Sequence, residues 1–348
     1  MSKARGLADL GNAFDDGALS NRRMTYNGAM NVWQRGTSAD TASNGDYMCD
    51  RWLVGHSGLD GNVDWDQETS STPDGFANAL KISTDASETS LDAGDYLFFS
   101  QRFEGQDLQH LQKGTANAKK LALSFWVRSS VASTYTVELR DNDGTRTIGK
   151  SYEINTADTW EYKTLIFEGD TSGTFSNDAN FSLELFFWID GGSRWSGGTF
   201  STAWQADDED ERLYDTTGWL ESTSPTFYIT GVQLEVGDTA TPFEHRSYGD
   251  ELAKCQRYYY ETGPRALSLA NATTTGFTFR EPRYNQIALP VTMRTTPTAV
   301  RTVSEQSLSG GTELTWGKTF VGVKPTNYSG DIPSGSYSYG GAILDAEL

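Results

Sequence analysis

The sequence predicts an all-β protein: an antiparallel, jelly-roll-like β-sandwich, followed by a short helix and a smaller C-terminal β domain. Three observations predict this fold. Short segments rich in β-branched and aromatic residues recur along the chain, separated by Gly, Asn, Asp and Ser. Apolar and polar residues alternate within several of these segments, as in strands that bury one face. A single stretch has the spacing of a capped amphipathic helix.

The first 24 residues form a separate segment. Small and charged residues dominate residues 1–24, and their few apolar side chains supply too little area for a core. We expect an arm that becomes ordered against another protein; a frayed terminus is the alternative. The arm residues expected to make the contact are Arg5, Leu7, Leu10 and Phe14.

Residues 25–245 contain the densest strand signals and are expected to form the sandwich. Asn142-Asp143-Gly144 is a hairpin-turn signal within this region. Eight or more strands with turns between them favour one large antiparallel sandwich. The segments expected as strands are 50–54, 76–82, 96–103, 121–128, 135–140, 160–167, 181–189 and 226–236.

A long aromatic-rich loop is expected at residues 191–222. Disordered segments contain few aromatic residues, so we expect this loop to be ordered. Flat Trp and Tyr rings stack on the apolar faces of sugars at low entropic cost, although packing between subunits would use the same rings. The candidate carbohydrate-binding residues are Trp195, Trp204, Tyr214 and Trp219. Three further tryptophans lie within strand segments and are expected in the core: Trp126, Trp160 and Trp188.

Residues 246–260 are expected to link the two β domains through a helix at 247–258. Ser247 and Asp250 match a helix-capping pattern. Four apolar or aromatic side chains fall on one helix face and are expected to seat the helix on a domain or on another subunit: Leu252, Cys255, Tyr258 and Tyr259.

Residues 261–348 are expected to form the small distal β domain, which is short but long enough to fold. Gly, Ser and Thr-rich turns separate its strand signals. The strands expected after the helix are 257–261, 276–280, 286–293, 298–303, 318–324 and 341–348.

The charge of the chain excludes several classes of partner. The sequence has 28 Lys and Arg against 47 Asp and Glu, a net charge of −19. Nucleic-acid binding requires a basic surface, and anionic membranes repel an acidic one. No apolar run reaches the roughly 20 residues that span a bilayer. The N-terminus lacks the apolar region of a secretory signal, so we expect synthesis in a cytoplasm without such export.

The sequence contains little that indicates catalysis or a cofactor. Its three histidines, His56, His110 and His245, have no catalytic or zinc-binding motif around them. Cys49 and Cys255 are expected to be buried or unpaired thiols. We therefore expect neither a catalytic residue nor a metal. For the acidic run at 206–211, a structural calcium is the alternative to a solvated loop.

Three phrases of the sequence resemble the fibre proteins of marine tailed bacteriophages, in particular podoviruses and relatives that infect cyanobacteria. The first comprises ARGLADLGN and DDGALSNR within residues 4–22. The second is NGAM-x-V-x-QRG at 27–36. The third runs from VQLEVG at 232 through ATPFEHR to CQRYY, which ends at 259. The C-terminal part resembles these fibre proteins only in the general character of its sequence.

The resemblance implies a virion component, usually a homotrimer, whose arm docks to the particle while its distal parts face the host. The implied function is a non-enzymatic tail fibre that attaches to a host-surface glycan or protein. One alternative is a structural adaptor or head decoration protein that binds no receptor. Another is a polysaccharide depolymerase, since two carboxylates suffice for glycoside hydrolysis, although the repeats of an extended β-helix are missing from the sequence.

Overall fold

The computed structural model describes residues 22–262, 267–270, 285–306, 312–325 and 337–348. The chain divides into two compact units, Met1–Tyr248 and Gly249–Leu348. The arm residues Arg5, Leu7, Leu10 and Phe14 lie outside the described residues, so the docking arm stays a prediction.

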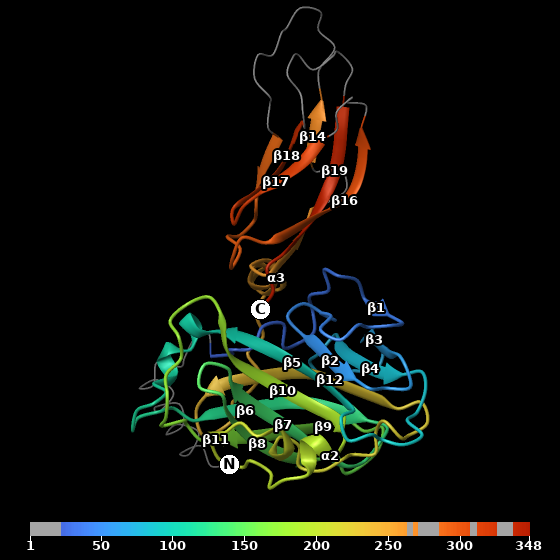
Figure 1. Ribbon diagram of the computed structural model, residues 1–348, viewed down its shortest axis with the longest axis vertical. Helices are drawn as coiled ribbons and strands as arrows, with labels where there is room; N and C mark the ends of the chain where they lie inside the picture. The colour runs from blue at the N-terminus through green and yellow to red at the C-terminus, as the bar shows by residue number, and fades with distance from the viewer. Residues whose placement is uncertain (1–21, 263–266, 271–284, 307–311, 326–336) are drawn as a thin grey trace, which may run out of the picture. The chain divides into compact units, whose positions relative to one another are not determined.

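The first unit is a β-sandwich of two six-stranded antiparallel sheets, which confirms the predicted fold class (Figure 1). We call the first sheet A. In spatial order its strands are β1 (Ser38–Ala39), β3 (Val63–Glu68), β4 (Ala79–Thr84), β12 (Thr226–Val236), β6 (Leu121–Ser129) and β9 (Glu161–Phe167).

The second sheet, sheet B, contains the strands that face the viewer in Figure 1. In spatial order they are β11 (Gln205–Ala206), β8 (Arg146–Glu153), β7 (Thr134–Asp141), β10 (Phe181–Gly191), β5 (Tyr96–Glu104) and β2 (Leu53–Ser57). Each expected strand of the sandwich has a counterpart, apart from shifts at the ends. The sequence did not single out β3 or β8, whose polar residues weaken the strand pattern.

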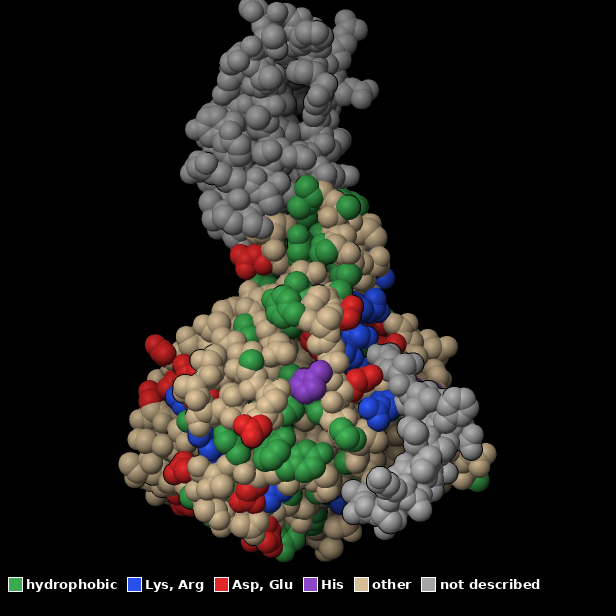
Figure 2. Space-filling view, turned by 180° about the vertical axis from the view of Figure 1, so that it is seen from behind, with side chains coloured by type: hydrophobic (Ala, Val, Ile, Leu, Met, Phe, Trp, Pro, Cys, Tyr) green, Lys and Arg blue, Asp and Glu red, His purple; other side chains and the backbone are tan. Residues whose placement is uncertain are grey.

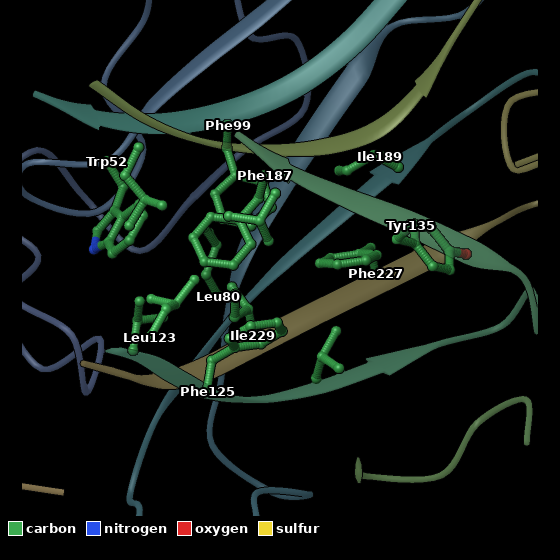
Figure 3. Close-up of a cluster of buried hydrophobic side chains, with 14 of the residues drawn as sticks. Trp52, Leu80, Phe99, Leu123, Phe125, Tyr135, Phe187, Ile189, Phe227 and Ile229 are labelled. Carbon is green, nitrogen blue, oxygen red and sulfur yellow. The ribbon is translucent and has the colours of Figure 1, made fainter. Parts of the chain in front are cut away.

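The core lies between the two sheets. It consists mainly of the side chains that point inward at every second position of the strands (Figure 3). Leu123, Phe125 and Val127 of β6 are fully buried, because every second residue of a strand points to the same face. The rings of Phe99 and Phe187 stack across the core, with centroids 4.9 Å apart. Burying such rings supplies the main stabilisation of the sandwich.

The NGAM phrase, residues 27–30, forms a turn that packs against this core. The side-chain oxygen of Asn27 accepts hydrogen bonds from the backbone N–H groups of Asn31 and Val32, at 2.8 and 2.9 Å. Its amide nitrogen donates to the carbonyl groups of Val32 and Asp50. Gly28 lies against β12, where a Cβ would stand 2.1 Å from the carbonyl oxygen of Val232. This phrase is therefore a structural element of the sandwich.

The second unit contains the helix α3 (Tyr248–Gln256), apart from its first residue, and two small sheets. One sheet joins β13 (Tyr259–Glu261), β19 (Tyr337–Asp345), β14 (Leu267–Ala270) and β16 (Thr298–Gln306). The other joins β15 (Asn285–Ala288), β18 (Phe320–Pro325) and β17 (Thr312–Trp316). The expected strand at 276–280 lies outside the described residues, while β14 and β17 were not expected.

The helix begins one residue later and ends two residues earlier than expected. Of its expected apolar face, Cys255, Tyr258 and Tyr259 are buried and Leu252 is half-buried. Tyr259 belongs to β13, which pairs with β19, and the carbonyl of Tyr258 accepts a hydrogen bond from Ala346. This face therefore helps to tie the helix to the sheet of its own unit. Its role as a joint between domains or subunits stays a prediction.

Candidate functional site

The long loop is ordered, as expected, and its two ends are tied to Asp190 at the end of β10. One carboxylate oxygen of Asp190 accepts hydrogen bonds from the backbone N–H groups of Gly191 and Thr217, at 2.9 and 2.8 Å. The other accepts from Leu220 at 3.0 Å. Burial raises the pKa of Asp190, although these hydrogen bonds act to lower it. The loop is thus fixed to the sandwich at both ends.

Two of the four predicted rings of this loop pack inward. Trp219 is 0% exposed and belongs to the core, so it offers no surface to a sugar. Trp204 is half-buried against the same core, and its indole N–H donates to the carbonyl of Glu168 at 2.6 Å. These two residues stabilise the loop.

Trp195 joins a cluster that the loop builds on the outer face of sheet B. Phe186 and Trp188 of β10 point away from the core, yet they are buried there together with Leu213 of the loop. The Arg212 guanidinium lies over the rings of Phe186, Trp188 and Trp195, with its central carbon 5.1–5.9 Å from their centroids. The loop therefore covers this part of sheet B.

Tyr214 is the exposed ring among the four, at 51%. Its neighbour Phe200 meets it edge-on, with ring centroids 5.7 Å apart. Phe200 itself lies over Gly149 of β8. This pair offers a small apolar surface, and the structure does not bring the four predicted rings together into one site.

A larger group of surface rings lies on the outer face of sheet A. Trp126 of β6 stands opposite Tyr162 of β9, with ring centroids 5.4 Å apart and planes tilted by 50°. Tyr162 is 45% exposed. We define the aromatic face by six residues on this side of the sheet, of which Tyr228 is buried at 9% exposure: Phe76, Trp126, Trp160, Tyr162, Tyr228 and Phe243. Figure 2, seen from behind, shows hydrophobic side chains gathered beside a histidine on the side of the sandwich turned away in Figure 1.

The absence of a side chain at Gly231 allows the rings to pack directly on the sheet. Gly231 of β12 has a φ of +65°, and a Cβ there would stand 2.7 Å from Phe76 Cζ and 3.2 Å from Trp126 Cδ1. Phe76 also contacts the rings of Phe243 and His245, with centroids at 5.0 and 5.3 Å. The aromatic face thus continues from β9 across β12 to the segment after it.

Charged side chains form a row beside these rings. Tyr228 of β12 pairs in register with Arg128 of β6 on one side and with Lys81 of β4 on the other; Lys81 pairs in turn with Asp66 of β3. The Lys81 ammonium is 2.9 Å from the Asp66 carboxylate, and this hydrogen bond raises the pKa of Lys81. With strands about 4.8 Å apart, the row from β3 to β6 spans about 14 Å.

Arg128 differs from its neighbours because it has aromatic contacts in place of an ion pair. Its guanidinium carbon lies 3.8 Å from the centroid of Tyr228 and 5.4 Å from that of Trp160. Its Nη1 donates to Ser71 Oγ at 2.7 Å, and its buried Nε has no hydrogen-bond acceptor among the described residues. Nearby Glu68 accepts hydrogen bonds from Ser70 and Ser71.

The expectation that Trp126 and Trp160 lie in the core is wrong; both are half-buried on the outer face. Their hydrophobicity favoured the core, whereas the alternation of their strands favours the surface. Trp126 has the opposite parity to Phe125 and Val127, and Tyr162 has the opposite parity to Leu165 and Phe167. That parity was the signal in the sequence for the aromatic face.

The histidines and cysteines lie in ordinary structural settings. His56 places its Nε2 3.0 Å from the carbonyl oxygen of Ala42, and His110 and His245 are exposed. Both cysteines are buried, and burial, with Asp50 nearby, raises the pKa of Cys49. Within the described ranges, no cluster of three or more His, Cys, Asp or Glu side chains has a metal-binding arrangement. Among the same residues, no helix has the length and apolarity needed to cross a membrane.

In fold, the sandwich is similar to carbohydrate-binding modules and to a domain of a phage tailspike. No family model and no curated protein matches the chain. A family 11 carbohydrate-binding module of Clostridium thermocellum is 14% identical, covering 59% of this chain and all of that module, with a TM-score of 0.29. A family 61 module in complex with β-1,4-galactotriose is 11% identical over 62% of this chain and all of that module, with a TM-score of 0.32.

A third similar structure comes from a virus. It is the enzymatically active domain of tailspike protein 4 of bacteriophage CBA120, which is 12% identical with a TM-score of 0.31. The match covers 54% of this chain and 19% of the tailspike chain, so this chain spans about a fifth of that protein.

Proposed function

We propose that this protein binds glycan through the aromatic face of sheet A, as a non-enzymatic virion fibre protein that attaches a phage to its host. The observation that supports the binding most directly is the pair Trp126 and Tyr162. Its rings stand side by side at the surface, with charged and hydroxyl groups on the neighbouring strands. Sugar C–H faces stack on such rings, while hydroxyl groups bind the polar neighbours.

The tilt of the rings limits which glycans fit. Because the planes of Trp126 and Tyr162 differ by 50°, a flat crystalline polysaccharide cannot lie on both rings at once. A single soluble glycan chain can rotate about the linkages between its sugars. Successive sugars can therefore stack on the two tilted rings. The proposed ligand is therefore an individual glycan chain, such as those that project from a cell surface.

Replacing both Trp126 and Tyr162 with Ala is expected to reduce glycan binding about a hundredfold. Each stacked ring contributes on the order of 1–2 kcal/mol, which is about tenfold in affinity. The measurement is affinity electrophoresis and calorimetry of the full chain with host-surface polysaccharide. Tyr214→Ala is the matched control, since it removes an exposed ring elsewhere. Equal affinity of the double variant and the control would contradict the proposal.

The assembly of the protein is also proposed from the family resemblance. The fibre would be a homotrimer in the virion, made in the host cytoplasm and docked through the arm at residues 1–24. Several copies on one particle raise the overall affinity of the particle above that of one weak site, because a first bound copy increases the effective concentration of the others. A structural adaptor without receptor binding would instead leave particles incomplete when the protein is removed, whereas loss of an attachment protein yields complete particles that adsorb poorly. Release of reducing ends from the polysaccharide would favour a depolymerase.

A further inference from the structure

We propose that the aromatic face selects an acidic glycan, with Arg128 as the residue that recognises a uronate carboxylate or a sulfate ester. This inference rests on the proposed function and specifies its ligand. It depends on a guanidinium that lies over two rings of the face, those of Tyr228 and Trp160.

The ion pairs of sheet A distinguish Arg128 from the other cations on its strands. The Lys81 ammonium lies 2.9 Å from a carboxylate oxygen of Asp66, and the Lys163 ammonium lies 2.6 Å from a carboxylate oxygen of Glu161. Arg128 forms no ion pair within the part of the chain that the structure describes. Two of the three cations on these strands are thus neutralised by a carboxylate, and Arg128 is not.

The guanidinium of Arg128 is also held in a fixed orientation. It lies 3.8 Å from the centroid of Tyr228, and its Nη1 donates to Ser71 Oγ. The indole N–H of Trp160 donates to the carbonyl of the same Ser71, at 2.9 Å. Since an arginine has five N–H donors, a fixed guanidinium with one described hydrogen bond retains donors for a ligand. A planar fork of this kind matches the oxygens of a carboxylate or a sulfate.

The carboxylate of Glu68, near Arg128, is already hydrogen-bonded to its own loop. Glu68 Oε1 accepts three hydrogen bonds, from Ser70 N, Ser70 Oγ and Ser71 N, and lies beyond ion-pair distance from the guanidinium. Burial acts to raise the pKa of Glu68, but these hydrogen bonds and the charge of Arg128 lower it below its ordinary value. The charge of −19 on the whole chain repels polyanions at long range. An acidic glycan can therefore be favoured only through short-range contacts such as those of Arg128.

The test compares acidic polymers with their neutral counterparts on the full chain, by calorimetry at one salt concentration. Polygalacturonate is paired with carboxyl-reduced polygalacturonate, and dextran sulfate with dextran. We expect the wild type to bind at least one acidic polymer about tenfold more tightly than its neutral partner, because one charge-assisted hydrogen bond supplies roughly that factor. Which pair shows the preference distinguishes carboxylate from sulfate.

Arg128→Gln is expected to reduce this preference to about one, because the acidic polymer loses about tenfold more affinity than its neutral partner. Arg128→Lys, which keeps the charge but loses the planar fork, should retain part of the preference. Melting temperatures of both variants verify that the fold is intact. A wild type without preference for either acidic polymer, or an Arg128→Gln variant that keeps the preference, would overturn the inference. The Trp126→Ala and Tyr162→Ala double variant separates this from failure of the proposed function, because it should lose both polymers of the preferred pair.

Discussion

Replacing Lys113 with Met is expected to destabilise the first unit by about 3–5 kcal/mol, the usual cost of removing one partner of a buried ion pair. The Lys113 ammonium is 3% exposed and lies 3.0 Å from a carboxylate oxygen of both Asp141 and Asp170. It also donates to the carbonyl of Ser172. Met fills similar volume but leaves two buried carboxylates without this cation. Urea unfolding monitored by tryptophan fluorescence measures the change.

Lys120→Met is the matched control for Lys113→Met. Lys120 also pairs with a carboxylate, that of Glu168 at 2.9 Å, but both side chains are about half exposed. Exposed pairs contribute about 0–1 kcal/mol. Equal losses of unfolding free energy in the two variants would contradict the prediction. They would mean that the buried ion pairs of Lys113 contribute no more than an exposed pair.

Acid should weaken the same cluster. Burial acts to raise the pKa of Asp170, but hydrogen bonds from Arg146 and Lys113 outweigh it, so its pKa lies below the ordinary value. A carboxylate with a lowered pKa in the folded protein stabilises the fold above its unfolded pKa, and this contribution is lost as the pH falls through the folded value. Part of the difference between the wild type and Lys113→Met should therefore disappear toward low pH.

Replacing Arg212 with Met is expected to cost a similar 3–5 kcal/mol and to loosen the long loop from sheet B. The Nε of Arg212 donates to both carboxylate oxygens of Glu138, at 2.9 and 3.1 Å, and Glu138 is fully buried on β7. The variant leaves this carboxylate with its bonds from Trp188 and Thr147 alone. Urea unfolding and limited proteolysis of the loop measure the two effects.

The double variant Arg212→Met with Glu138→Met tests the cause of that loss. Removing both charges should recover part of the stability, because the buried carboxylate is then absent. Arg194→Met is the surface control, since its guanidinium pairs with Glu209 and both side chains are more than half exposed. A double variant that is destabilised by the sum of the two single losses would contradict the account of the buried pair.

The sandwich could be predicted from the sequence because its strands alternate strictly. The order LALSFWVRS places Leu123 and Phe125 on one face and Trp126 on the other, whatever the neighbouring strands are. What surrounds a face depends on tertiary structure. Trp188 points away from the core like Trp126, yet Arg212 and Leu213 of the loop bury it.

The sequence predicted exposed aromatic side chains, but at other positions than those that the structure brings together. Surface tryptophans and tyrosines were expected to bind glycan, and the aromatic-rich loop was the natural position for them. Trp219 of the loop lies in the core, however, because Asp190 at the end of β10 fixes the neighbouring residues Thr217 and Leu220. The rings of Trp126 and Tyr162 come together only through the register of β6 with β9, which the sequence does not specify.

The most direct test of the central claim is a structure of the full chain with a bound oligosaccharide from the host-surface glycan. The account predicts that the sugar lies on the outer face of sheet A, with its rings stacked on Trp126 and Tyr162 and an anionic group at Arg128. A sugar bound instead at Phe200 and Tyr214, or on the second unit, with the aromatic face unoccupied, would contradict it.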